Sequence, residues 1–233
     1  MVSLDARLAS AVIARTFAGT VAELHARAMP TEGELPELWV MQPSAPAIAM
    51  GSSQRPALFD ESRLAAHGVE LAPRRSGGGA VFIDPASTVW IDLLAPRSSR
   101  WWSSELSQNF MMVGAAWQQA LASLAVDTDL CAEAPRRTEA AALACWAGRG
   151  WGELTIGPDR AKVVGLSQRR TRWGCRVQAM AVLDGSSARV GDYVLAPNQS
   201  VIREAIPTTT VAITVTALQA AVLDAFECSP QSG

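Results

Sequence analysis

Three consecutive glycines follow two arginines at residues 74–79, in the run Arg-Arg-Ser-Gly-Gly-Gly, and lead into an apolar segment at Ala80. Glycine has no Cβ, so successive backbone N–H groups can approach a ligand oxygen, while arginines add positively charged forks. A phosphate, a carboxylate or an acyl carbonyl would fit such a loop. The competing interpretation is a glycine-rich turn whose arginines are solvated. The run is neither a P-loop nor a dinucleotide fingerprint, because no Gly-Lys-Ser/Thr follows and the glycines enter a strand.

A lysine opens the second candidate segment. Lys162 precedes the apolar run Val-Val-Gly-Leu at residues 163–166, and Ser-Gln-Arg-Arg-Thr-Arg follows at residues 167–172. An ammonium at the start of a buried strand could polarise a carbonyl or give up a proton. The alternative is a lysine that snorkels at a strand end, with a solvated basic turn after it.

Cysteines and histidines restrict the chemistry further. His25 and His67 are the only histidines, which excludes most zinc sites and serine-histidine triads. A reducing cytoplasm would leave the cysteines as free thiols. The four cysteines are Cys131, Cys145, Cys175 and Cys228. They form no Cys-x-x-Cys pair and have no metal-site spacing, so we expect no metal centre.

Composition indicates one globular domain over residues 1–233, since the chain is 49% apolar and 18% charged. A formal net charge of -2 leaves no basic field for nucleic acid or anionic lipid. Residues 1–8 include Asp5 and Arg7 and lack the apolar core of a secretory signal. No apolar run reaches the roughly 20 residues that span a bilayer. We therefore expect a cytoplasmic protein.

The elements that would position these segments are short strands between helices. Residues 58–67 read as a helix that ends at Gly68, and residues 81–83 and 88–94 as a hairpin. The residues from Leu106 to Leu124 carry an apolar stripe at helical spacing, with Ser103 or Ser104 as a cap. We also expect residues 6–29 to form one helix or two, and residues 217–226 to form a helix that begins with Thr216 and Gln219 at capping-box spacing. The other expected strands are residues 38–41, 47–50, 143–146, 153–156, 162–167 and 177–183. Strands in the middle and helices at both ends predict an α+β fold around a mostly antiparallel sheet flanked by helices.

Read together, three ordered blocks are more specific than any one of them. Residues 46–54 read Pro-Ala-Ile-Ala-Met-Gly-Ser-Ser-Gln, and they precede the glycine run at residues 74–81 and the lysine segment at residues 162–171. In residues, order and spacing they resemble the lipoate-protein ligase and octanoyltransferase superfamily. The resemblance covers about residues 38–184, which would form the core of the domain, and it implies the catalytic fold shared by lipoate and biotin ligases.

The resemblance also implies a site. In the family, the arginine/serine-glycine loop and the lysine segment enclose the acyl chain and its activated carbonyl, and the family lysine falls on Lys162. The implied acyl- or nucleotide-binding positions are Arg74, Ser76, Gly77, Gly78, Gly79, Ala80, Gly165, Ser167, Gln168 and Arg169.

A further match points to one branch of the family. Cys145, followed by Trp151, Glu153 and Leu154, resembles the Cys-x5-Trp-x-Glu-Leu block of cysteine-dependent octanoyltransferases and lipoyl amidotransferases. In that branch the cysteine forms an acyl thioester, so the resemblance makes Cys145 the candidate nucleophile. For an arbitrary cysteine, a buried structural thiol would be the favoured interpretation.

This chain departs from the family pattern at three places. Family members often carry histidine after the glycine loop and in a Gln-His-Gly block, where this chain has Ile83 and Ala179. Pro73 stands where the pattern has its first arginine. Without a motif histidine, a Cys145 thiolate would depend on Lys162 or on backbone dipoles.

Three functions follow as alternatives. The leading hypothesis is transfer of an octanoyl or lipoyl group through a Cys145 thioester to a lysine of a lipoyl domain, without a cofactor. The second is an ATP- and Mg-dependent lipoate-protein ligase that acts through lipoyl-adenylate. The third is a noncatalytic lipoyl-binding or regulatory protein. The expected partners are lipoyl domains of 2-oxoacid dehydrogenases or the glycine cleavage H protein, with acyl carrier protein as a possible donor, and neither nucleic acid nor a membrane.

Overall fold

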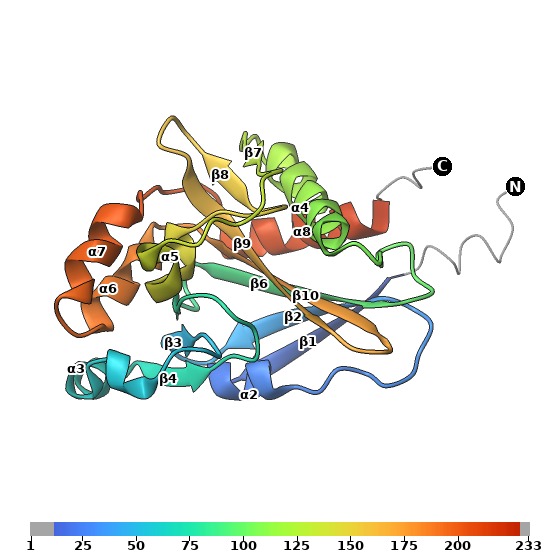
Figure 1. Cartoon of the computed structure of the whole chain (residues 1–233). Coiled ribbons are helices and arrows are strands. Elements are labelled where there is room, and N and C mark those ends of the chain that lie inside the picture. Colours follow the sequence, from blue (N-terminus) through green and yellow to red (C-terminus); the bar gives the residue numbers. More distant parts are fainter. Residues whose placement is uncertain (1–11, 229–233) are drawn as a thin grey trace, which may run out of the picture.

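The computed structural model describes residues 12–228, which form a seven-stranded sheet, a three-stranded sheet and helices around both (Figure 1). The large sheet has the order β1-β2-β6-β10-β9-β8-β7, and the small one has the order β4-β3-β5. Among the strand pairs of the described residues, only β1/β2 and β3/β4 are parallel. The predicted α+β fold with a mostly antiparallel sheet is therefore confirmed.

The strands are β1 (Ile13–Gly19), β2 (Glu37–Pro43), β3 (Ala47–Met50), β4 (Glu70–Pro73), β5 (Val81–Ile83), β6 (Thr88–Pro96), β7 (Asp129–Leu130), β8 (Leu154–Ile156), β9 (Ala161–Arg170) and β10 (Gly174–Val182). The α-helices are α2 (Val21–Ala26), α3 (Glu61–Ala66), α4 (Leu106–Ser123), α5 (Glu139–Leu143), α6 (Val190–Tyr193), α7 (Asn198–Ala205) and α8 (Val215–Cys228). The 3₁₀ helices are η1 (Pro56–Leu58), η2 (Cys145–Ala147) and η3 (Ser186–Arg189).

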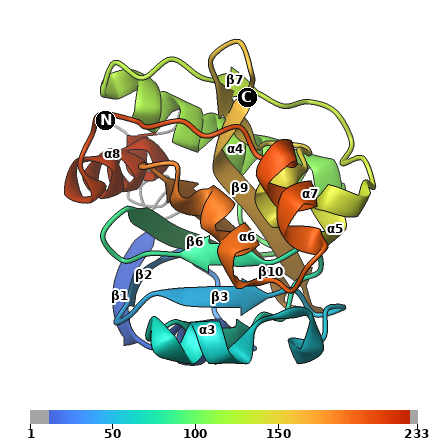
Figure 2. The ribbon, with the colours of Figure 1, turned by 90° about the vertical axis from the view of Figure 1, so that its left-hand side faces the viewer.

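The large sheet separates two apolar cores. Helices α4 and α8 pack on one face, where Trp117 and Phe226 are fully buried (Figure 2). The three-stranded sheet, α2 and α3 lie on the other side, with Trp90, Phe82 and Tyr193 in the second core. Strands β6, β9 and β10 are buried along most of their length because both faces are covered.

Most of the expected strands are confirmed. Residues 38–41 lie in β2, 47–50 in β3, 162–167 in β9 and most of 177–183 in β10, while β8 covers most of 153–156. The helix predicted from the apolar stripe between Leu106 and Leu124 is confirmed as α4. Elements β4, β7, α6 and α7 were not predicted.

The expected helix at residues 6–29 is wrong within the described part of the chain; residues 6–11 lie outside it. Residues 13–19 form β1, which pairs in parallel with β2, and only α2 is helical. The β-branched and aromatic residues Ile13, Thr16 and Phe17 suit an edge strand, so pairing with β2 outweighs the helix propensity of the alanines. The expected helix at 58–67 is also shorter, because Asp60 caps α3, although Gly68 has the expected positive φ of 63°.

The expected hairpin at residues 81–94 is also wrong. Strands β5 and β6 both form, but β5 pairs with β3 in the small sheet and β6 with β2 and β10 in the large one. The Asp84 carbonyl accepts from the Thr88 N–H at 2.9 Å, and its side chain accepts from the Ala86 N–H at 3.0 Å. This turn directs the chain from one sheet into the other.

The expected strand at residues 143–146 is wrong as well. The Thr138 hydroxyl accepts from the Ala141 N–H at 3.1 Å and caps α5, which ends at Leu143, and η2 follows. The alanine run therefore forms a short helix, and only an isolated bridge between Ala144 and Ala80 remains of the strand.

Two helix caps differ from expectation. Thr214 caps α8 in place of Thr216, because its hydroxyl accepts from the Ala217 N–H at 3.1 Å. Residue Glu105 precedes α4 without a side-chain cap, and Ser103 accepts only from the Glu105 N–H.

Candidate active site

Lys162, the second residue of β9, is held at the centre of the candidate site. Its side chain is 2% exposed, and its ammonium donates to both carboxylate oxygens of Glu153, at 2.9 and 3.0 Å, and to the Cys145 carbonyl at 2.8 Å. Three N–H bonds have three acceptors, so the ammonium is fully hydrogen-bonded. The Trp146 indole N–H donates to the Lys162 carbonyl at 2.9 Å and fixes the backbone beneath it.

Glu153, just before β8, is the counter-ion, and it is held from both sides. Its carboxylate also accepts from the Gly150 N–H at 2.9 Å and the Leu166 N–H at 3.1 Å. The two backbone donors and the Lys162 ammonium together fix the orientation of the carboxylate. From the sequence, Glu153 was part of a motif but had no predicted role; a charged residue directly before a buried strand was the available signal.

Cys145 stands between the glycine loop, residues 74–80, and Lys162. Helix α5 ends just before it, and the chain then runs beside Ala80: the Ala80 N–H donates to the Leu143 carbonyl, and the Cys145 N–H donates to the Ala80 carbonyl, both at 2.9 Å. The Cys145 side chain is half-buried and the residue borders two cavities. The local fold thus brings the predicted loop, cysteine and lysine together.

The glycine loop is shaped from within by Arg74. This buried guanidinium donates to the Gly77 and Gly79 carbonyls, each at 2.8 Å, so it holds the loop. Gly78 has φ +91°, which disfavours other residues, and a Cβ on Gly79 would collide with the backbone of Ala144. Within residues 12–228, the N–H groups of these three glycines donate to no protein acceptor. They form an array of donors for a ligand oxygen.

Two neighbouring cavities border Cys145. The first, called the cleft, has a volume of about 560 Å³. The second, called the slot, is narrow, with about 30 Å³. Cleft and slot share Arg74, Cys145, Leu166 and Ser167. The cleft is lined by Gly77, Gly78, Gly79, Glu153, Lys162, Arg136, Arg137 and Arg149, and the slot by Ala49, Val81, Trp90, Trp146, Gly165, Met180, Gln178 and His25.

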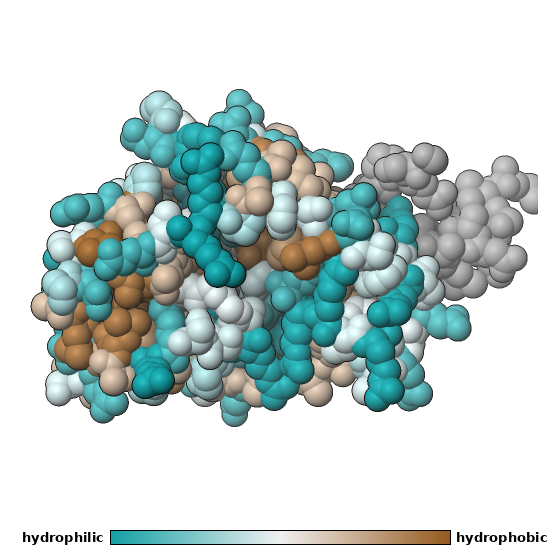
Figure 3. Space-filling model, viewed as in Figure 1, coloured by the Kyte–Doolittle hydropathy of each residue, from teal (hydrophilic) through white to brown (hydrophobic). Residues whose placement is uncertain are grey.

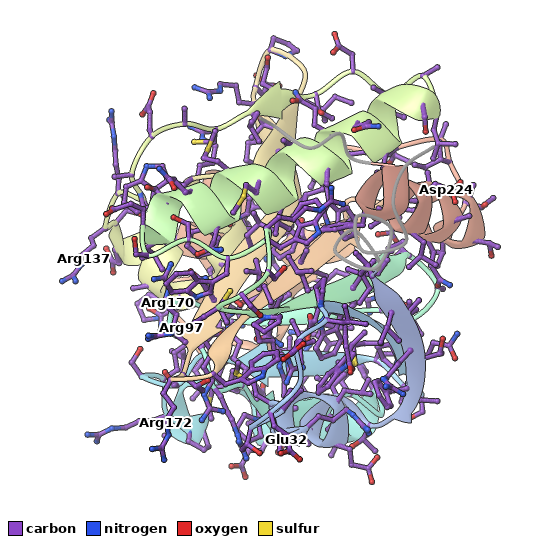
Figure 4. All side chains as sticks on the ribbon, turned by 90° about the vertical axis from the view of Figure 1, so that its right-hand side faces the viewer. Glu32, Arg97, Arg137, Arg170, Arg172 and Asp224 are labelled. Atoms are coloured by element: carbon purple, nitrogen blue, oxygen red, sulfur yellow. The ribbon has the colours of Figure 1, made fainter. Side chains whose placement is uncertain are left out.

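The surface around the cleft is polar. Figure 3 shows a hollow near the centre of one face, with hydrophilic side chains along its edge and apolar ones within it. Arg137 extends away from the body of the protein (Figure 4). A long apolar group could enter the slot, while a charged or polar group stayed in the cleft.

His25 in α2 was not assigned to the site from the sequence, yet it lines the slot. Burial lowers its pKa from 6.5 to about 3, and the positive charges of Arg74 and Arg176 add to that effect. The imidazole is therefore neutral at physiological pH. No motif pointed to it, because it lies more than a hundred residues before Gln178, its neighbour in the structure.

The remaining predicted residues are divided between the site and its surroundings. Gly165 lines the slot, Ser167 lines both cavities, and Ser76 is a buried residue of the glycine loop. Gln168 and Arg169 lie further along β9 and line neither cavity; Arg169 borders a separate hollow with Arg75. Ile83 and Ala179, at the places of the family histidines, are packed in the two apolar cores.

Residues 12–228 contain neither a candidate metal site nor a membrane-spanning helix. No group of three His, Cys, Asp or Glu side chains in this part is placed to hold a metal ion. None of the helices described there is both long and apolar enough to cross a membrane.

Comparison with known proteins identifies the fold and the family. Residues 19–227 match the family model of the lipoyl protein ligase A/B catalytic domain. A putative lipoate protein ligase from Thermoplasma acidophilum with bound lipoic acid is similar in structure, with a TM-score of 0.64 and 16% identity over 83% of this chain and 72% of that chain. A bipartite lipoate protein ligase of the same organism, from a structural study of the ligase and its E2 lipoyl domain, is also similar. Its TM-score is 0.67, with 16% identity over 92% of this chain and 81% of that chain.

A lipoate-protein ligase A bound with ATP is also similar, with a TM-score of 0.67 and 15% identity over 92% of this chain and 83% of that chain. At these identities the structures show a shared fold. Comparison with curated proteins gave no significant match. Because the family model spans most of the chain, the protein belongs to the family of lipoyl protein ligase A/B catalytic domains.

Proposed function

We propose that this protein transfers an octanoyl or lipoyl group to a lysine of an acceptor lipoyl domain through a thioester on Cys145. Family membership supports an enzyme of the ligase or transferase kind that acts in protein lipoylation. The observation that carries the finer proposal is the position of Cys145, at the junction of cleft and slot and between the glycine loop and Lys162. A nucleophile at that junction reaches a carbonyl whose chain lies in the slot.

The first step forms the thioester. The Cys145 sulfur attacks the acyl carbonyl of a donor thioester, the new C–S bond forms and the donor C–S bond breaks, and the proton of the Cys145 thiol passes to the donor sulfur, which leaves as a thiol. In the second step the neutral amine of the acceptor lysine attacks the same carbonyl. The amide forms, the bond to Cys145 breaks, and the amine proton passes to the departing sulfur.

The donors around Cys145 suit the charge that develops on the carbonyl oxygen. Gly77, Gly78 and Gly79 line the cleft, and their N–H groups have no acceptor among the described residues, so they are available to bind this oxygen. Lys162 can reach it only by exchanging one of its bonds, and the two bonds to Glu153 allow one to be released. Lys162 therefore supplies positive charge in both steps.

Partners follow from the shape of the site. The cleft is open to solvent, which leaves room for an acceptor lysine to enter. The T. acidophilum study that pairs a ligase with its E2 lipoyl domain supports a lipoyl domain as acceptor. A glycine cleavage H protein as acceptor and acyl carrier protein as donor belong to the same proposal, which needs no cofactor.

The second candidate function is an ATP-dependent lipoate ligase. Arg136, Arg137 and Arg149 along the cleft favour it, because a triphosphate would lie between them and the glycine loop, and a similar structure was solved with ATP. Lipoyl-adenylate would then form in the cleft with Mg, and Cys145 would have no chemical role.

Intact-mass spectrometry after incubation with octanoyl-acyl carrier protein, and separately with lipoate plus a lipoyl domain, tests both functions. The proposal predicts an adduct without ATP that hydroxylamine removes, that Cys145→Ser abolishes and that Cys131→Ser, the change of a buried nearby thiol, retains. Lipoyl-domain modification that requires ATP and Mg and survives Cys145→Ser would support the ligase. No modification under any condition would support a noncatalytic binder.

A further inference from the structure

The wall of the slot carries a polar group that the acyl-transfer chemistry does not use. His25 is 5% exposed, and its ring packs against Trp90 with 4.6 Å between centroids. Its Nδ1 lies 3.3 Å from the amide nitrogen of Gln178. Its Nε2 is buried and has no hydrogen-bond partner among the described residues.

The surroundings decide which ring nitrogen carries the proton. The Gln178 amide nitrogen donates to the Asp92 carboxylate at 3.4 Å, and the Gln178 oxygen accepts from the Ser167 hydroxyl at 3.4 Å. A flipped amide would direct its oxygen at the carboxylate, which is repulsive. Gln178 therefore donates to Nδ1, Nδ1 accepts, and the single proton of the neutral ring lies on Nε2.

The ring is also held in place. Arg176 donates to the Leu24 carbonyl at 3.2 Å and the Arg27 carbonyl at 3.1 Å, at the C-terminal end of α2, and it forms an ion pair with Asp92. Helix α2 is thereby attached to the large sheet on both sides of His25. An unpartnered donor that cannot swing toward water indicates that a ligand supplies the acceptor.

We propose that the Nε2–H of His25 donates a hydrogen bond to an acceptor at the far end of the bound acyl chain, and so favours a lipoyl over an octanoyl group. The inference rests on the proposed function, because that function places the carbonyl at Cys145 and the chain in the slot. The slot is narrow, and its other walls include Ala49, Val81 and Met180. The sulfurs of a dithiolane ring are polarizable weak acceptors.

A saturated chain end offers no acceptor and leaves the Nε2–H unpaired. Sulfur is a weak acceptor, so the affinity for lipoate should exceed that for octanoate by only about tenfold. This is the lower end of the affinity loss expected when a buried donor is left without an acceptor.

Isothermal calorimetry with lipoic acid and octanoic acid tests this inference without the need for turnover. The unmodified protein should bind lipoic acid about tenfold more tightly than octanoic acid. His25→Phe, which keeps the ring shape and removes the donor, should bring the two affinities within about twofold. His25→Gln, which retains an N–H donor, should keep part of the preference. Circular dichroism and thermal melts would establish that both variants are folded.

The outcomes separate the inference from the proposed function. Equal affinities in the unmodified protein, or an undiminished preference in folded His25→Phe, would overturn the role of His25. A clear preference that depends on His25, in a protein that forms no Cys145 adduct and transfers neither group, would support the role of His25 and overturn the proposed transfer.

Discussion

Two buried ion pairs lie on the same side of the large sheet, and they differ in what surrounds them. Lys162 and Glu153 are 2% and 8% exposed and border the cleft. Arg176 and Asp92 are 5% and 0% exposed, lie beneath α2 and line neither cavity. Burial raises the pKa of Asp92, while the attraction of Arg176 works against that rise.

The difference between the two cations explains their positions. The Arg176 guanidinium directs rigid donors at Asp92 and at two carbonyls of α2, so it fixes one element on another. Lys162 carries a compact charge on a flexible stem and can exchange one acceptor for another. A buried pair beneath a helix is suited to structure, whereas one at the wall of a cavity is suited to chemistry.

The largest expected effect is the loss of activity in Lys162→Met. Removing the charge beside the reacting carbonyl should lower the rate of acyl transfer by about a thousandfold or more, because even one neutral oxyanion donor is worth about 10²–10³. Single-turnover transfer measured per folded molecule checks this. The matched variant Arg176→Met should lose far less activity per folded molecule; equal losses would remove the contrast between the pairs.

The second effect is on stability. Arg176→Met leaves Asp92 without its partner in a fully buried position and removes the bonds to α2, so the free energy of unfolding should fall by about 3–5 kcal/mol. Urea denaturation would measure it. Lys162→Met should destabilise the protein less, because Glu153 keeps its bonds to the Gly150 and Leu166 N–H groups. The opposite order of stability would contradict the assignment of Arg176 to structure.

A pH effect should report on His25, which links the Asp92 network to the slot. Its pKa is about 3 in the folded state and 6.5 in the unfolded chain, so between these values the unfolded chain binds more protons. Stability is then fully present above pH 6.5 and lost as the pH falls toward 3. From pH 7.5 to pH 5, His25 should lower the free energy of unfolding by about 2 kcal/mol. Denaturation curves of His25→Gln at both pH values should lack this component; an identical loss would mean that His25 titrates normally.

The smallest expected effect is on the stability and KM of variants at two glycines with positive φ. Gly78→Ala in the loop and Gly68→Ala after α3 should each cost about 1–2 kcal/mol of stability, since φ is +91° and +63°. Only Gly78→Ala should also raise the KM of the acyl donor, because its Cβ would contact the Arg74 guanidinium that holds the loop carbonyls. Steady-state kinetics of both variants, with melting temperatures, measure the difference. A KM that is equal in the two would exclude a role of the loop in binding.

The sequence by itself determined the fold class and the segments that meet at the site. The apolar stripe from Leu106 predicted α4, and alternation and β-branched residues predicted most strands, because these signals are local. The glycine run, Cys145 and Lys162 were chosen from residue type and spacing, and they meet around one cleft. Their chemical roles remain predictions.

Only the tertiary structure decided which elements pair and which side chains complete the site. Strands β5 and β6 read as a hairpin, but their pairing depends on two separate sheets, and the segment at residues 143–146 is bent along the glycine loop by contacts with Ala80. His25 reaches the slot because β1 and α2 pack against strands that are distant in sequence. Local patterns encode propensity, whereas these arrangements arise from long-range pairing and burial, which no window of sequence contains.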